Sequence, residues 1–275
     1  MQYIIDACTV INLLHIDEDE FLLKKIKNLE FIICNAVFEE INKNVYKKLE
    51  KIKPYPKEKR KEIEIKLNYF RERIQNDDSY KDLDENLSKL LSYSKKNGEF
   101  YSMLLSFYLN TFNKTRVIFF TDDSPAKKEF TPYLEHHKIG YIEDSVDLLI
   151  TLYRHNDGFT TADLKRFLSS LYHEYASEIG ALEKELVNFE MPKSEIRNQE
   201  LAKMLSSLRH SIKKMELEEV SKLYLQVTED EKKYLSIYDI LNKFSDFFRN
   251  DISSEFLLKI KTNIAYADSK PFYKF

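Results

Sequence analysis

Two short apolar runs that each end in a carboxylate constrain the fold of this chain most strongly. Tyr3–Ile5 runs into Asp6, and Arg116–Thr121 runs into Asp122 and Asp123. An apolar run that stops at an acid is typical of a buried parallel strand. Ligands of open α/β sheets bind just beyond the carboxyl ends of the strands. One such Asp is more often a helix cap or a turn residue, so a binding site requires further acids at the same place.

Two further strand-like segments are Leu29–Cys34 and Ile139–Ile142, and helical patterns separate all four runs. Strands that alternate with helices imply a parallel sheet with crossover connections. We therefore expect an α/β fold in the first part of the chain. The charged stretch at about 43–97 has helical spacing, and Pro54 and Pro56 break it into two helices.

From Phe159 onward the pattern becomes all-helical. Thr160–Asp163 resembles a capping box at the start of a long helix. Ser194 is expected to cap a second helix and Thr228 to open a third. The pattern indicates a helical C-terminal module, which could pack as a bundle.

Composition narrows the possible classes of protein. The chain has 275 residues, of which 43% are hydrophobic and 13% aromatic, so a packed core is expected. Four glycines in the whole chain argue against a Gly-rich phosphate loop. Neither a signal peptide nor an apolar run of the ~20 residues needed to span a bilayer is visible. We expect a cytoplasmic protein, not associated with a membrane, with Cys8 and Cys34 as free thiols.

Two helix starts add acids to those at the strand ends. Glu40 follows the second strand, and Glu99 follows Gly98 at the start of a helical pattern. In a parallel sheet, strand ends and the first turns of the following helices share one edge. Carboxylates collected at that edge repel one another unless a cation intervenes. Oxygen ligands of this kind suit Mg²⁺ or Mn²⁺, ions that can activate water for attack on a phosphodiester.

Four short motifs, in this order, resemble those of the PIN-domain family of nucleases, found in bacterial toxins and RNA-processing enzymes. The motifs are Ile5–Leu13, Val37–Ile41, Gly98–Ser102 and Phe120–Lys127. The resemblance covers residues 1–172, with a basic helical insertion at about 43–97 and a helical extension over 173–275. It implies a three-layer α/β/α PIN-like domain with a short parallel sheet.

The resemblance also implies the site. Mg²⁺ or Mn²⁺ would be held by carboxylates, and the expected catalytic and metal-binding residues are Asp6, Glu40, Glu99 and Asp122. Asp123 would be an auxiliary metal-binding acid, and Asn12 and Thr121 would support the site or contact substrate. This chain departs from the family pattern at Cys8, where a hydroxyl or amide is usual.

Several of these residues have ordinary alternative roles. Glu39 competes with Glu40, Glu99 suits a helix start through the helix dipole, and Asp123 suits a helix N-cap. The basic segment from Lys43 to Arg73 is usual for a solvated helix, although positive charge interleaved with tyrosine also suits RNA contact.

The expected function is that of a metal-dependent endoribonuclease acting on RNA, as a toxin or defence effector. By the resemblance, an antitoxin or another defence-system protein would be its partner, and the C-terminal helices could bind that partner, form a homo-oligomer or clamp substrate. The alternatives are a catalytically silent PIN-like interaction scaffold and a nuclease acting on DNA. Cleavage assays with Mn²⁺ on labelled RNA and DNA separate the three.

Overall fold

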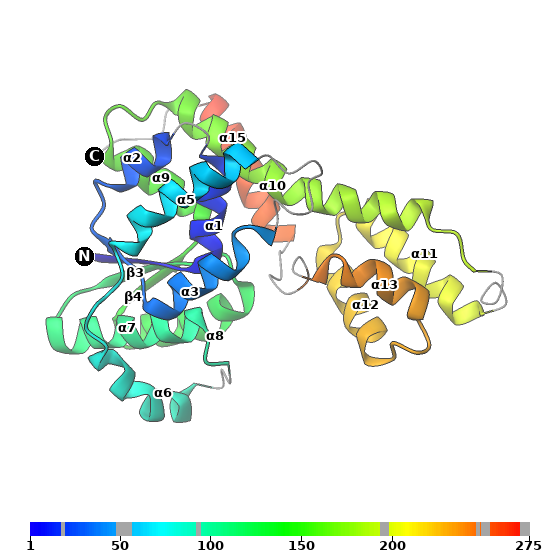
Figure 1. The fold of residues 1–275 in the computed structure, drawn as a ribbon, viewed down its shortest axis with the longest axis horizontal. Helices are drawn as coiled ribbons and strands as arrows, with labels where there is room; N and C mark the ends of the chain where they lie inside the picture. The colour runs from blue at the N-terminus through cyan, green and yellow to red at the C-terminus, as the bar shows by residue number, and fades with distance from the viewer. Residues whose placement is uncertain are drawn as a thin grey trace. The chain divides into compact units, whose positions relative to one another are not determined.

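A computed structural model describes residues 1–17, 20–47, 57–91, 95–192, 198–245, 248 and 254–269 of the chain. The protein is mixed α/β and mostly helical, with a small parallel sheet (Figure 1). The chain forms two compact units. The first comprises Met1–Phe167 and the C-terminal end from Ala267, and the second comprises Leu168–Tyr266.

The described sheet has four strands, namely β1 (Gln2–Ile5), β2 (Phe31–Ile32), β3 (Val117–Phe120) and β4 (Gly140–Glu143). Their order is β2-β1-β3-β4, and every neighbouring pair is parallel. The register places Ile5 opposite Phe120 and Phe120 opposite Glu143. The carboxyl ends of β1, β3 and β4 therefore lie level with one another, and the residues that follow them meet at one edge.

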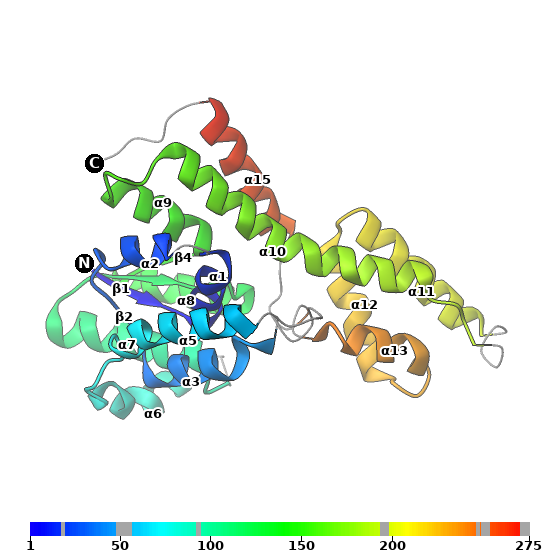
Figure 2. The same cartoon turned by 45° about the horizontal axis from the view of Figure 1, so that its top comes forward.

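Both faces of the central strands are buried. Ile4 and Ile5, like Phe119 and Phe120, are fully buried although successive strand residues point to opposite faces. Helices accordingly cover the sheet on both sides, as Figures 1 and 2 show. This double covering explains why the central strands appear in the sequence as continuous apolar runs rather than as alternating ones.

The helices of the first unit connect and cover these strands. They are α1 (Ala7–Ile16), α2 (Phe21–Ile26), α3 (Asn35–Asn44), α5 (Lys57–Arg71), the 3₁₀ helix η1 (Ser79–Leu83), α6 (Asp84–Leu90), α7 (Gly98–Asn113), α8 (Ser124–His136) and α9 (Ser145–His155). α10 (Thr161–Asn188) begins in this unit and continues into the second. The α/β class and the parallel sheet are thus confirmed, whereas assignment to the PIN-like fold stays a prediction.

Local signals in the sequence explain several of the helix starts. Pro125 is in the first turn of α8, whose N-cap Asp123 accepts a hydrogen bond from the backbone of Ala126. Thr160 and Asp163 form the reciprocal hydrogen bonds of a capping box before α10. Pro54 and Pro56, expected to break a helix, lie outside the described residues.

The second unit is helical and contains the rest of α10, α11 (Gln199–Lys213), α12 (Leu217–Glu229), α13 (Leu235–Asn242) and α15 (Ser254–Ser269) up to Tyr266. The expectation that Thr228 opens a helix is wrong, because Thr228 lies in the last turn of α12. Met215, with a φ of 59°, turns the chain between α11 and α12. Ser194 lies outside the described residues.

The division between the units falls inside α10, at Phe167 and Leu168. The domain boundary expected after residue 172 stays a prediction. Among the described helices, none is both long enough and apolar enough to cross a membrane.

Candidate active site

Acids from four elements meet beyond the carboxyl ends of β1 and β3. Asp6 follows β1 and is the N-cap residue of α1, and Asp123 has the same place between β3 and α8. Glu99 is in the first turn of α7, and Glu40 lies on α3. We call Asp6, Glu40, Glu99 and Asp123 the acidic cluster. Three of these acids stand at helix N-termini, where the helix dipole favours negative charge.

Gly98 defines the space between two of these acids. A Cβ atom built at Gly98 would lie 2.9 Å from Oε2 of Glu40 and 3.4 Å from Oδ1 of Asp6. The two carboxylate oxygens therefore point toward the same small volume beside the first residue of α7. The backbone N–H of Gly98 also donates a hydrogen bond to Glu40. Glycine at this position leaves the carboxylates room to approach one another.

Asp6 is fully buried, and its two oxygens have different surroundings. Oδ2 accepts hydrogen bonds from Sγ of Cys8 at 3.0 Å and from Oγ1 of Thr121 at 3.1 Å. Oδ1 is buried and has no hydrogen-bond partner among the described residues, and the same is true of Oε2 of Glu99. Because an unsatisfied buried oxygen is costly, two of them in one acidic cluster call for a further group.

The pKa values of these acids show how strongly they interact. Burial and then the charges of Glu40 and Asp123 raise the pKa of Asp6 to about 7. Burial and then the charges of Asp6, Glu40 and Asp123 raise the pKa of Glu99 to about 10. Burial also raises the pKa of Glu40, and Asp123 adds to this effect. Such mutual repulsion is what a cation placed among the carboxylates relieves.

Asp122, expected to be a metal ligand, is surrounded by hydrogen-bond donors. Its Oδ1 accepts from the backbone N–H of Ser145 at 2.8 Å. Its Oδ2 accepts from Nδ2 of Asn12 at 2.7 Å and from the hydroxyl of Ser145. Asp122 is not among the charges that act most strongly on Asp6, Glu40 or Glu99. Asp122 thus ties α1 and the start of α9 to the end of β3.

Thr121 and Cys8 link Asp6 to the residues that follow β3 through hydrogen bonds. Thr121 is buried, and its Oγ1 both donates to Asp6 and accepts from the backbone N–H of Asp123 at 3.1 Å. Cys8 donates to Asp6 and accepts from the backbone N–H of Asp122 at 3.2 Å. The Cys8 thiol therefore provides a hydrogen-bond donor beside Asp6. Burial, with the charges of Asp6 and Asp122, raises the pKa of Cys8, so the thiol is neutral.

Two further residues of this region bear on the sequence-based expectations. Glu39, the competitor of Glu40, is exposed and accepts a hydrogen bond from the side chain of Asn35 at 2.8 Å. Ser145 was not predicted, although it opens the helix that follows β4. A polar residue in the first turn of the helix after a strand was the signal that could have identified it.

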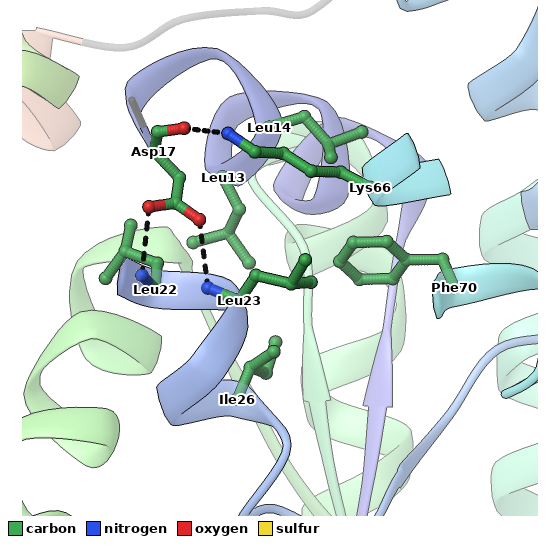
Figure 3. A pocket seen from close by; sticks show the side chains of 8 residues that line it. All are labelled: Leu13, Leu14, Asp17, Leu22, Leu23, Ile26, Lys66 and Phe70. Atoms are coloured by element: carbon green, nitrogen blue, oxygen red, sulfur yellow. Dashed lines mark hydrogen bonds between the residues drawn. The ribbon is translucent and has the colours of Figure 1, made fainter. Parts of the chain in front are cut away.

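Lys66 and Asp17 form another buried polar group in the first unit, at a small pocket lined mostly by apolar side chains (Figure 3). Lys66 is fully buried and donates to the carbonyl of Asp17 and to Glu62. The pocket has room for about one water molecule. It is too small for a substrate, and its polar groups serve the packing of α1, α2 and α5.

Within the described residues, no three His, Cys, Asp or Glu side chains stand close enough, as placed, to hold a metal ion. In comparisons with known proteins, no protein-family model, no curated protein and no solved structure matches the chain. The geometry of the acidic cluster is therefore the basis for any functional assignment.

Proposed function

We propose that this protein is a metal-dependent endoribonuclease with a PIN-like first unit, and that the acidic cluster is its active site. One observation carries the proposal: four carboxylates from separate elements converge beyond the sheet, and two of their oxygens are buried with no hydrogen-bond partner in the described part of the chain. A parallel sheet with ligand-binding residues at its carboxyl edge is consistent with this assignment.

The donor set fits Mg²⁺ or Mn²⁺, because both ions prefer carboxylate oxygens and water to nitrogen or sulfur. Asp6, Glu40, Glu99 and Asp123 would hold the ion directly or through water. When bound, such an ion neutralises charge at the phosphate and lowers the pKa of water. Asp122 remains a predicted ligand from the sequence, but its hydrogen bonds to Asn12 and Ser145 favour Asp123 in that role.

The chain itself would bind and orient the reacting groups. Cys8 and Thr121 fix the carboxylate of Asp6 through Oδ2 and leave Oδ1 to face Glu40. Gly98 fixes Glu40 through its backbone N–H. Fixed acids of this kind hold charge in place before the reaction begins, which is the arrangement that favours electrostatic catalysis.

Cleavage of labelled single-stranded RNA and DNA in Mn²⁺ or Mg²⁺ tests the proposal. We expect RNA cleavage that chelation of the metal abolishes. Asp6→Asn and Glu99→Gln should each lower the rate by more than the ~10–100-fold typical of losing an outer-shell partner. Glu99→Gln removes a buried acid whose raised pKa costs folding free energy at neutral pH, so this variant should be at least as stable as the wild type.

Other outcomes would select the alternatives. Cleavage of DNA alone would indicate a DNA nuclease. No cleavage of either polymer by the folded protein would leave a PIN-like interaction scaffold. Wild-type rates in both variants would exclude the acidic cluster as the site.

The biological setting is a further part of the proposal. Unregulated RNA cleavage is harmful to a cell, so we propose a toxin or defence effector restrained by an antitoxin-like partner. This part is supported by the sequence resemblance alone. Co-expression with the product of a neighbouring gene, followed by purification and cleavage assays, tests it.

A further inference from the structure

Helix α3 carries positive charge directly beyond the acid that it contributes to the cluster. Lys43 is three residues after Glu40, and Lys47 follows four residues later. Lys43 lies on the same side of α3 as Glu40, whereas Lys47 follows just after the helix ends at Asn44. Lys43 is exposed and Lys47 is half-exposed. Both charges act on the carboxylate of Glu40 and oppose the rise in its pKa.

The positive charge continues from α3 onto α5. The guanidinium of Arg60 lies over the ring of Tyr46, with 4.7 Å between its Cζ atom and the ring centroid. This contact joins the end of α3 to the first turns of α5, where Lys57, Arg60 and Lys61 are exposed. The basic residues therefore extend away from the acidic cluster across two neighbouring helices. Figures 1 and 2 both show α3 and α5 side by side.

The acidic cluster and the exposed basic residues interact with an anionic polymer in opposite ways. The acids repel phosphate unless a metal ion stands between them, whereas lysine and arginine neutralise phosphates directly. A polymer with phosphates at regular intervals can satisfy both, with one phosphate at the acids and the following ones on the basic residues.

We propose that Lys43, Lys47 and Arg60 bind the backbone of the RNA strand as it leaves the acidic cluster along α3 and α5. This inference rests on the proposed function and adds to it the path of the substrate. Tyr46 lies beside this path with Arg60 over one face of its ring, and aromatic rings stack with bases of single strands.

Binding of a labelled single-stranded RNA by fluorescence anisotropy, in EDTA so that cleavage does not intervene, tests the proposal. We compare wild type with Lys43→Gln/Lys47→Gln between about 50 and 200 mM salt. Each lost phosphate contact should reduce the slope of log K against log salt by about 0.7. The double variant should therefore lose about 1.4 in slope and, at 0.1 M salt, roughly 25-fold in affinity.

The matched control is Lys24→Gln/Lys138→Gln, which removes the same charge. Lys24 on α2 and Lys138 before β4 are exposed and precede strands, so they lie toward the opposite edge of the sheet. The control should bind as wild type does. Equal losses in the two double variants, or no loss in the first, would overturn the proposed path.

Two outcomes distinguish the RNA-binding path from the nuclease activity. A wild-type protein that cleaves RNA while Lys43→Gln/Lys47→Gln keeps the full salt slope excludes the path and leaves the nuclease. A wild-type protein that binds RNA with the expected slope but never cleaves it excludes the nuclease and leaves the binding surface.

Discussion

Gly98 is the residue at which the acidic cluster depends most on the absence of a side chain. In Gly98→Ala the new Cβ would lie 2.9 Å from Oε2 of Glu40 and 3.1 Å from a methyl group of Val37. The carboxylate has to move, because the buried Val37 cannot. We expect cleavage to fall at least about 10-fold, as for other losses of positioning. Overpacking of about 1–3 kcal/mol, partly offset by helix propensity, should lower the free energy of unfolding by about 1 kcal/mol.

The control is Gly180→Ala in α10, where a new Cβ would meet no atom within 4 Å. Alanine is favoured over glycine inside a helix by about 1 kcal/mol. Gly180→Ala should therefore raise the free energy of unfolding and leave cleavage unchanged, as measured by urea denaturation and a cleavage assay. Wild-type cleavage by Gly98→Ala would show that Glu40 does not need its present position.

Adjacent residues Asp122 and Asp123 are expected to respond differently to the same substitution. Asp122→Asn places an amide NH₂ among the donor groups of Asn12 and Ser145, so at least one hydrogen bond is lost. We expect a loss of about 1–3 kcal/mol in the free energy of unfolding. Asp123→Asn keeps an effective N-cap for α8 and removes a charge from the cluster. It should lower cleavage while the melting temperature is maintained.

Both variants are measured by thermal unfolding and by RNA cleavage under the same conditions. The reverse pattern, with stability lost in Asp123→Asn and cleavage lost in a fully stable Asp122→Asn, would return the ligand role to Asp122. The variant that loses cleavage without losing stability therefore identifies which of the two acids belongs to the cluster.

The sequence was sufficient to place several acids near one another, since strand ends and helix starts are visible as local patterns. It could not distinguish Asp122 from Asp123, because that difference depends on which donors the fold brings to each carboxylate. Asn12 is close in sequence to Asp6 but bonds to Asp122, and Ser145 comes from another strand end. A local pattern can mark Ser145 as a polar residue near a strand end, but it does not show which carboxylate Ser145 binds.

At the scale of elements, α2 depends on a cap that comes from the end of the preceding helix. Its N-cap residue, Glu20, has a φ of 53° and makes no side-chain capping bond. Both oxygens of Asp17 instead accept from the backbone N–H groups of Leu22 and Leu23, each at 2.9 Å. A buried carboxylate thus replaces the missing cap of a short helix (Figure 3).

Asp17→Ala should lower the free energy of unfolding by about 2 kcal/mol, because two buried backbone donors lose their acceptor. Asp17→Asn keeps one acceptor oxygen and should have a smaller effect. Chemical denaturation of both variants measures the difference. An effect of Asp17→Ala below that of Asp17→Asn would show that the carboxylate is not the cap of α2.

Strands and helices were predictable from the sequence where a single local feature determines them. The two central strands were visible because burial on both faces makes their residues apolar, and α8 and α10 were visible from Pro125 and the Thr160 capping box. The break between α11 and α12 was not visible in the sequence, because Met215 adopts a positive φ with no glycine or proline nearby. A non-glycine residue in that conformation is held by tertiary packing, which no local pattern records.

At the scale of the whole molecule, the acidic cluster should make the free energy of unfolding fall as the pH rises. The pKa of Asp6 is raised from 3.8 to about 7, and that of Glu99 from 4.5 to about 10. In this range the folded protein binds more protons than the unfolded chain, so its stability falls as the pH rises. We expect the free energy of unfolding of the metal-free protein to decrease between about pH 5 and pH 8, by at most about 1.4 kcal/mol per pH unit for each group.

Acids with lowered pKa values instead lower the stability as the pH falls, and they do so in a more acidic range. Asp84 and Glu200, which are paired with lysines, lose their stabilising contribution as the pH falls toward and below their ordinary values of 3.8 and 4.5. Measurements between about pH 5 and 8 therefore avoid the range in which Asp84 and Glu200 titrate. Glu99→Gln removes one of its titrating groups and should flatten the curve, which thermal unfolding across this range tests. A metal-free wild type that gains stability toward pH 8 would contradict the prediction.

Metal binding should act on the same charges and so depend on the same pH range. A cation binds the ionised cluster more tightly than the protonated one, because protons and metal compete for the same oxygens. Stabilisation by ligand follows RT ln(1 + [L]/Kd), so at fixed Mn²⁺ the rise in melting temperature should be larger near pH 8 than near pH 5.5. Glu99→Gln should lose most of this rise, whereas Gly180→Ala should keep it. An equal rise in Glu99→Gln and wild type would mean that the ion binds elsewhere, even if the pH dependence of the metal-free protein is as predicted.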